Sequence, residues 1–170
     1  MNTRILGQSG VSISEVGFGT WKYKGDPDVL QHALDLGSTF IDTAESYGTE
    51  SAVGKSLLGR RHDAFIATKV SPWNFRYPEV IKAAENSLKN LSIDTIDLYQ
   101  LHAPNRTIPI EETMGAMRDL VSTGKVRFIG VSNFSVGELV AAQSALGNIP
   151  IVSNQIKYSI FDQPISSSFN

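Results

Sequence analysis

The feature that most constrains the fold is a regular alternation of short apolar segments with amphipathic segments. The apolar segments have the length and composition of buried strands, and the segments between them carry apolar residues at helical spacing. Strands separated by helices form a parallel sheet, because each connection must return to the same end of the sheet. The predicted strands span 15–21, 38–41, 64–68, 95–101, 126–131 and 151–153, and the predicted helices span 27–36, 50–58, 78–91, 111–123 and a segment that begins with a capping box at 135–138.

Two observations favour an α/β fold of the (β/α)8 TIM barrel type over an open doubly wound sheet. A polar residue capable of chemistry ends nearly every predicted strand, which is where barrel active sites are assembled. The first strand also lacks the G-x-G-x-x-G fingerprint of an open dinucleotide-binding sheet, since only Gly17 and Gly19 are present. A small N-terminal β-hairpin with glycines in its turn precedes this strand and is expected to cover the bottom of the barrel.

Composition limits the classes of protein to which the chain can belong. Its 170 residues suffice for one domain with a substantial core, so we expect a single domain over 1–170. A formal net charge of -2 gives no electrostatic attraction to nucleic acid or anionic lipid, and no apolar run is long enough to span a membrane. The absence of cysteine excludes disulfides and thiolate metal sites. We expect a cytoplasmic protein with neither a nucleic-acid nor a membrane partner.

Four chemically active side chains follow the predicted strands. Asp42 and Tyr47 follow the second strand, Lys69 follows the third and His102 follows the fourth. Since the carboxyl ends of parallel strands meet at one end of a barrel, these groups are expected to gather there. Each alone has an ordinary interpretation, as a loop cap, a packing residue, a solvated lysine or a strand-end histidine. The four together favour an active site.

These residues stand in motifs that resemble those of the aldo-keto reductase family. The resemblance implies a barrel that uses NADPH to reduce the aldehyde or ketone group of a small-molecule carbonyl substrate. It assigns the catalytic tetrad to Asp42, Tyr47, Lys69 and His102. The motifs follow the hairpin in the family's order and are GFGTW at 17–21, FIDTAESYG at 40–48, TK at 68–69, LH at 101–102, GVSNF at 130–134 and NQ at 154–155.

Elementary chemistry agrees with this assignment. Carbonyl reduction places a hydride on carbon and leaves negative charge on oxygen, so a proton donor is needed at that oxygen. Tyr47 is the candidate donor. We expect the ammonium of Lys69 to lower the pKa of this phenol, and Asp42 to hold Lys69 in place. His102, as a neutral imidazole, is expected to orient the carbonyl through a hydrogen bond.

The resemblance also implies a site for the nicotinamide end of NADPH. Ser132, Asn133 and Gln155 match the side chains that hold the nicotinamide carboxamide, whose donor and acceptor suit hydroxyl and amide partners. Without the resemblance, Ser132 and Asn133 are equally well explained as an ordinary loop before the helix cap at Ser135. The positions that match those beside the nicotinamide ribose are Gly19, Thr20, Trp21 and Asp42.

The remaining aromatic residues and histidines give weaker signals. Trp21 ends one predicted strand and Trp73 follows another, so they either line a substrate pocket or pack in the core. No metal site is expected, because the histidines lack the spacing of metal ligands, and two of them, His32 and His62, are expected at the surface.

The chain departs from the resemblance in having six predicted strand–helix units where a complete barrel has eight. We therefore expect an incomplete, C-terminally truncated barrel, without the segments that in the family stack on the nicotinamide and hold the adenosine phosphate. Weakened NADPH binding, low stability and little activity would follow. The free edges of such a sheet invite self-association.

Two other functions stay open at this point. The chain could be a non-catalytic reductase-like subunit that binds or regulates a partner through the free edges. Alternatively, Lys69 at a strand end of a barrel could form a Schiff base, as in an aldolase, if its amine were desolvated. A carboxylate partner such as Asp42 argues against the second alternative, because it keeps the lysine charged.

Overall fold

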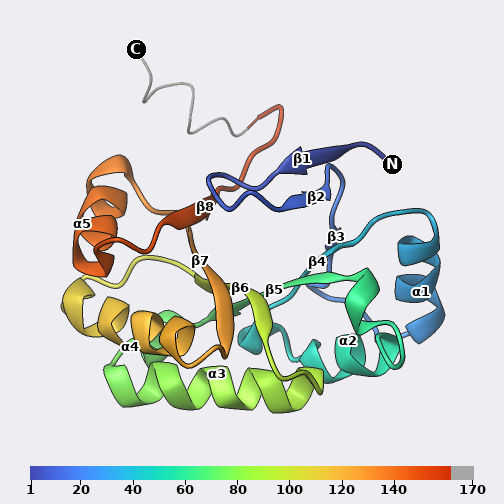
Figure 1. Cartoon of the computed structure of the whole chain (residues 1–170), viewed down its shortest axis with the longest axis horizontal. Helices are drawn as coiled ribbons and strands as arrows, with labels where there is room; N and C mark the ends of the chain where they lie inside the picture. Colours follow the sequence, from blue (N-terminus) through green and yellow to red (C-terminus); the bar gives the residue numbers. More distant parts are fainter. Residues whose placement is uncertain (162–170) are drawn as a thin grey trace.

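The main element of the protein is a curled sheet of six parallel strands, seen in a computed structural model that describes residues 1–161 (Figure 1). Each strand pairs with the next one along the chain. This sequential order is that of a (β/α)8 barrel, whereas a doubly wound sheet reverses its order in the middle. The incomplete barrel predicted above is therefore confirmed. The strands are β3 (Phe18–Gly19), β4 (Phe40–Asp42), β5 (Phe65–Val70), β6 (Ile96–Leu101), β7 (Val126–Ser132) and β8 (Ile151–Gln155).

Five helices follow the curved sheet around its outer face (Figure 1). Their apolar faces pack against the outward-facing residues of the strands, and Leu30, Val80 and Met117 are fully buried there. Within residues 1–161, none of the helices combines the length and the apolar character that a membrane crossing requires. The helices are α1 (Pro27–Asp35), α2 (Glu50–Ser56), α3 (Tyr77–Leu91), α4 (Ile110–Ser122) and α5 (Val136–Leu146).

Local sequence explains several helix boundaries. The Asp26 side chain accepts a hydrogen bond from the Asp28 N–H at the start of α1, and Gly37 follows its end with a positive φ of 86°. The predicted capping box at α5 is present, since Ser135 and Glu138 each accept a hydrogen bond from the other's backbone N–H. These two helices therefore begin where the sequence predicts.

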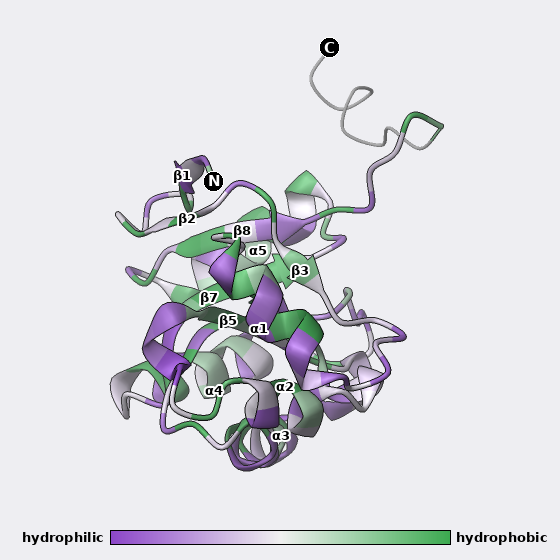
Figure 2. Ribbon diagram, turned by 90° about the vertical axis from the view of Figure 1, so that its right-hand side faces the viewer, coloured by the Kyte–Doolittle hydropathy of each residue, from purple (hydrophilic) through white to green (hydrophobic). Residues whose placement is uncertain are grey.

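The predicted N-terminal hairpin consists of β1 (Thr3–Ile5) and β2 (Ser12–Ser14) and covers one end of the sheet (Figure 2). Apolar residues of the hairpin, including Ile13, pack against a cluster that contains Phe65 at the start of β5. Gly7 in its turn has φ +49°, and a Cβ there would lie 2.2 Å from the carbonyl oxygen of Val152 in β8. Only glycine permits this approach, which confirms the hairpin as the cover at the amino end of the strands.

Two local features differ from the sequence prediction. The predicted strand 15–21 contracts to β3, because the Val16 carbonyl accepts hydrogen bonds from the hydroxyls of Ser14 and Ser38 instead of joining the sheet. Three short 3-10 turns were not predicted, since three residues are too few for a periodic pattern. They are η1 (Glu45–Tyr47), η2 (Arg61–Asp63) and η3 (Pro72–Asn74).

Candidate active site

Asp42 and Lys69 form a nearly buried ion pair at the carboxyl end of the sheet. The register partner of Asp42 in β5 is Ala67, so Lys69 lies two residues farther along on the same face of the sheet. Its Nζ donates hydrogen bonds to Asp42 Oδ1 at 2.6 Å and to the Thr43 carbonyl oxygen at 2.8 Å. Side-chain exposure is only 1% for Lys69 and 13% for Asp42. The strand register therefore places the ammonium beside its carboxylate.

Tyr47 and His102 lie together beside this ion pair. Turn η1 carries Tyr47, and its hydroxyl oxygen lies 3.3 Å from Nε2 of His102, which directly follows β6. The two rings meet edge to face, with centroids 5.4 Å apart. Ser46 Oγ lies 3.3 Å from the other ring nitrogen, Nδ1, and Lys69 Nζ lies 5.0 Å from the centre of the tyrosine ring. All four predicted tetrad residues are thus neighbours in space.

Burial has the same effect on the pKa of two of these groups. It lowers the pKa of the Lys69 ammonium, although the charge and hydrogen bond of Asp42 oppose this effect. Burial and then the positive charge of Lys69 lower the pKa of His102, while Asp42 and Glu45 oppose the change. The net effect favours the neutral form of the imidazole, which is the form expected from the sequence.

The predicted effect on Tyr47 is wrong in direction. Lys69 was expected to lower the pKa of the phenol, yet burial and then the negative charge of Asp42 raise it. The physical reason is that Asp42 accompanies Lys69 at 2.6 Å, so the ammonium does not act on the phenol as an isolated charge. Tyr47 consequently holds its proton more firmly than an ordinary tyrosine.

The predicted carboxamide-binding residues share one cleft with three of the four tetrad residues, Asp42, Tyr47 and His102. This cleft has a volume of about 310 Å³. Ser132 at the end of β7 donates its hydroxyl to the Gln155 carbonyl oxygen at 2.9 Å, and Asn133 adopts a left-handed φ of 58°. A left-handed conformation is uncommon outside glycine, with asparagine among the residues that tolerate it best. The cleft is lined by Asp42, Tyr47, His102, Ser132, Asn133, Gln155, Ile156 and Lys157.

One buried oxygen of a residue in this cleft has no hydrogen-bond partner within residues 1–161. Asp42 Oδ2 is inaccessible to solvent and accepts no hydrogen bond from the described residues, although Oδ1 is bound to Lys69. A buried carboxylate oxygen of this kind favours a hydroxyl donor from a ligand. The ribose of a nicotinamide nucleotide carries such donors, and the amide and hydroxyl side chains across the cleft suit its carboxamide. The residues present therefore fit the nicotinamide end of NADPH.

The other predicted ribose-site residues are arranged differently. Gly19 is the register partner of Asp42, but it does not line the cleft. Thr20 is fully buried, and its hydroxyl donates to the Asp42 carbonyl oxygen at 3.1 Å and lies 2.9 Å from Thr49 Oγ1. Its side chain thus binds the backbone of Asp42 and does not face the cleft. Trp21 is 68% exposed and lies outside the cleft lining.

The core-packing interpretation of the two tryptophans is wrong. Trp73, in η3, is 70% exposed, which is similar to Trp21. Both therefore lie at the surface in loops after the strands. His32 and His62 are exposed, as predicted.

The sequence did not identify four residues at this site. Glu45 and Ser46 lie inside the recognised segment 40–48, where a carboxylate and a hydroxyl beside Tyr47 were the available signal. Glu45 accepts hydrogen bonds from a neighbouring loop, and Ser46 contacts His102. Ile156 and Lys157 line the cleft just after β8, and nothing in their sequence pattern marks them.

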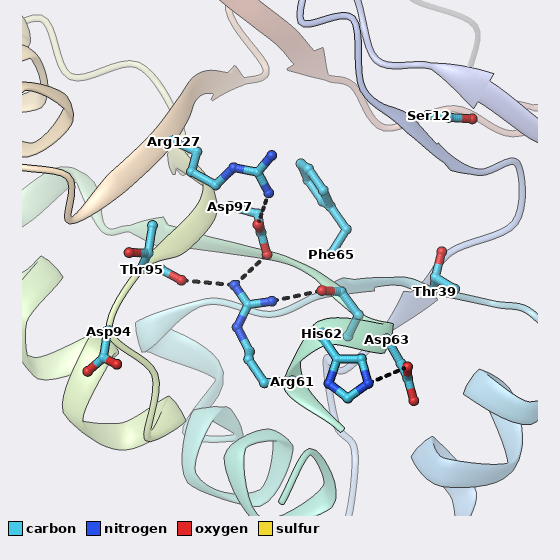
Figure 3. Close-up of a pocket in the computed structure, with 11 residues that line it drawn as sticks. Ser12, Thr39, Arg61, His62, Asp63, Phe65, Asp94, Thr95, Asp97 and Arg127 are labelled. Atoms are coloured by element: carbon cyan, nitrogen blue, oxygen red, sulfur yellow. Dashed lines mark hydrogen bonds and ion pairs between the residues drawn. The ribbon is translucent and has the colours of Figure 1, made fainter. Parts of the chain in front are cut away.

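A larger cavity, of about 650 Å³, lies at the amino end of the strands (Figure 3). Its centre is Asp97, which is bound by Arg61 and Arg127 at 2.6 Å each and by the Ile66 N–H at 2.9 Å. Arg61 also donates to the carbonyl oxygens of Ala64 and Thr95. These three charged groups, on turn η2 and on strands β6 and β7, bind one another, so a structural role accounts for the network.

The sequence matches the family model described as "Aldo/keto reductase family" over residues 15–168. It is 36% identical to aldo-keto reductase YhdN of Bacillus subtilis over 99% of this chain, and 37% identical to methylglyoxal reductase YeaE of Escherichia coli over 94%. The chain spans only 57% and 60% of the lengths of these two relatives.

Comparison with solved structures also finds aldo-keto reductases. The thermostable aldo-keto reductase Tm1743, solved with the inhibitor epalrestat, superposes with a TM-score of 0.90 at 42% identity, covering 95% of this chain and 64% of the other. An aldo/keto reductase from Klebsiella pneumoniae, solved with NADP and acetate, gives 0.83 at 32% identity, covering 94% and 60%. With a family match over most of its length and such relatives, the chain belongs to the aldo/keto reductase family.

Proposed function

We propose that the protein reduces a small aldehyde or ketone to an alcohol by hydride transfer from NADPH. The observation that carries this proposal is one cleft lined by the phenol of Tyr47, the imidazole of His102 and the carboxylate of Asp42, which is paired with the buried Lys69. Relatives that are methylglyoxal reductases support carbonyl reduction as the type of chemistry. A reacting carbonyl in this cleft would meet a proton donor and a second hydrogen-bond donor at its oxygen.

Tyr47 would deliver the proton. NADPH supplies the hydride when it is bound, and the carbonyl oxygen then becomes an alkoxide, a far stronger base than a phenolate. Because burial raises the pKa of Tyr47, its proton stays in place until that base develops. The Lys69 ammonium, 5.0 Å from the ring centre, would then stabilise the phenolate that remains. His102 would hold the carbonyl oxygen through a hydrogen bond.

The cofactor would be held by both sides of the cleft. Ser132, Asn133 and Gln155 would bind the nicotinamide carboxamide, and Asp42 Oδ2 would accept a ribose hydroxyl. These contacts concern only the nicotinamide end of NADPH. We therefore expect weak NADPH binding by the 170-residue chain, measurable by fluorescence titration.

The test of this function is Tyr47→Phe, assayed by the loss of NADPH absorbance with 4-nitrobenzaldehyde. Loss of a positioned proton donor should lower kcat by about 10²- to 10⁴-fold while NADPH binding persists. Tyr77→Phe is the matched control, because its phenol bonds to Asp119 on the exposed surface and should leave kcat unchanged. Equal turnover by Tyr47→Phe and wild type would remove Tyr47 from this role.

A wild-type chain that binds no NADPH and shows no turnover would contradict reduction by this chain. Capture of a stable partner complex by that same chain would favour the non-catalytic subunit instead. We also propose that the chain self-associates through β3 and β8, since each pairs with only one strand within residues 1–161.

A further inference from the structure

The carboxylate of Glu45 joins two loops at the mouth of the cleft. Glu45 opens turn η1, which also carries Tyr47. Its Oε1 accepts hydrogen bonds from the Ser71 backbone N–H at 2.5 Å and from Asn74 Nδ2 at 3.0 Å. Ser71 directly follows β5, the strand that carries Lys69. One side chain therefore connects the turn that presents the phenol to the strand that presents the ammonium.

Apart from the contacts of Ser46 and Tyr47 with His102, turn η1 is supported mainly by its own backbone. Its backbone hydrogen bonds are local, from the Tyr47 N–H to the Ala44 carbonyl at 3.0 Å and from the Gly48 N–H to the Glu45 carbonyl at 3.3 Å. A single 3-10 turn is weak when isolated, because few hydrogen bonds offset the ordering of its backbone. A charged acceptor for a backbone N–H is among the stronger hydrogen bonds available to such a turn.

We propose that Glu45 is a positioning residue that fixes Tyr47 relative to Lys69 and His102 by fastening η1 to the segment after β5. The segment it holds, Ser71–Asn74, also reaches the loop after β6. There the Asn105 side chain donates to the Pro72 carbonyl at 2.8 Å, and the His102 N–H donates to the Val70 carbonyl at 3.0 Å. The Glu45 contact thus lies where turn η1, the segment after β5 and the loop after β6 meet.

Glu45 also acts on His102 through its charge. The charged groups that affect the imidazole are Lys69, Asp42 and Glu45, and the hydroxyls of Tyr47 and Ser46 contact its two nitrogens. The negative charge of Glu45 raises the pKa of His102, whereas burial and Lys69 lower it. Removal of that charge should therefore lower the pKa of His102 further.

This inference rests on the proposed function for its meaning, but its test does not depend on turnover. Glu45→Ala removes both the acceptor and the charge, whereas Glu45→Gln keeps an uncharged acceptor of the same size. In Glu45→Ala, NMR should show the Ser71 amide exchanging at least about tenfold faster, the factor expected from the loss of a hydrogen bond to a charged group. The contact between the Tyr47 and His102 rings should weaken. Glu45→Gln should retain this contact, and the pKa of His102 should fall in both variants.

Glu112→Ala is the matched control, because Glu112 makes the same type of bond, to the Tyr77 N–H at 3.1 Å, away from the cleft. It should leave Ser71 exchange and the His102 titration unchanged. Unaltered Ser71 exchange and ring contact in Glu45→Ala would overturn the proposal. If Glu45→Ala does not fold, Ser71 exchange in Glu45→Gln decides the matter: it should become faster, by less than in Glu45→Ala, because the acceptor loses its charge, and unaltered exchange would overturn the proposal. Absence of turnover in the wild type would contradict the proposed function and leave these NMR outcomes intact.

Discussion

Asp42 and Lys69 bring two opposite charges almost completely out of water. Moving each charge into the protein costs several kcal/mol, and mutual attraction repays this only when the remaining polar atoms are also bonded. Lys69 meets this condition through Asp42 and the Thr43 carbonyl, whereas Asp42 Oδ2 does not. The bonding of the pair therefore leaves an acceptor at the cleft, and it does not give the stability that a fully bonded pair would give.

This imbalance predicts an unequal response to substitution. Asp42→Asn should lower the free energy of unfolding by about 3–5 kcal/mol, because it leaves the Lys69 ammonium buried without a counter-charge. Adding Lys69→Met to Asp42→Asn should recover part of that loss, since the unpaired charge is gone. Urea unfolding of the two single variants and the double variant measures these differences. A double variant less stable than Asp42→Asn would contradict the explanation.

Helices α2 and α3 approach one another closely because of a glycine. A Cβ on Gly54 of α2 would lie 2.5 Å from the Leu91 carbonyl oxygen at the end of α3. No side chain can move aside there, because the obstructing atoms belong to the backbone. Gly115 in α4 is different, since its Cβ would make only ordinary contacts at 3.9 Å.

Alanine at these two glycines should therefore have opposite effects. Gly54→Ala should destabilise the protein by about 1–3 kcal/mol through overpacking. Gly115→Ala should stabilise it by about 0.5–1 kcal/mol, because alanine restricts the unfolded chain and favours helix. Thermal unfolding of both variants provides the comparison. Stabilisation by Gly54→Ala would show that the two helices can separate without cost.

Elements could be predicted from the sequence where a periodic or capping signal exists. Helix α3 and the capping box of Ser135 and Glu138 are examples, because apolar spacing and cap chemistry are local properties. Turn η1 and the contact of Gly54 could not be predicted, since the first is too short for periodicity and the second depends on a residue far along the chain. The meeting of the tetrad followed from the order of the strands. The raised pKa of Tyr47 did not, because burial and the position of Asp42 decide it.

At the scale of the whole molecule, the curled sheet has two strands that are paired on one side only. Within residues 1–161 these are β3 and β8, at opposite ends of the strand order. The backbone groups along such an edge can bond to a strand of another molecule. Strand β8 has five residues and β3 only two, so β8 offers the longer edge.

The sheet edges predict association that depends on protein concentration. Sedimentation velocity should give an average mass that rises above 18.5 kDa as the concentration increases. In the same range, amide hydrogens of β8 should exchange more slowly, whereas those of β5, which is paired on both sides, should not change. A constant monomer mass together with unchanged exchange in β8 would contradict association through this edge.

The contact between Ser46 and His102 bears on the position of two hydrogens, that of the imidazole ring and that of the Tyr47 hydroxyl. A neutral imidazole carries one hydrogen, on either Nδ1 or Nε2, and its partners select the tautomer. If the Ser46 hydroxyl donates to Nδ1, the hydrogen of His102 lies on Nε2, which faces the oxygen of Tyr47. The Tyr47 hydroxyl then does not donate its own hydrogen to the imidazole. A serine at the rim would thereby keep the hydrogen of Tyr47 free to move into the cleft.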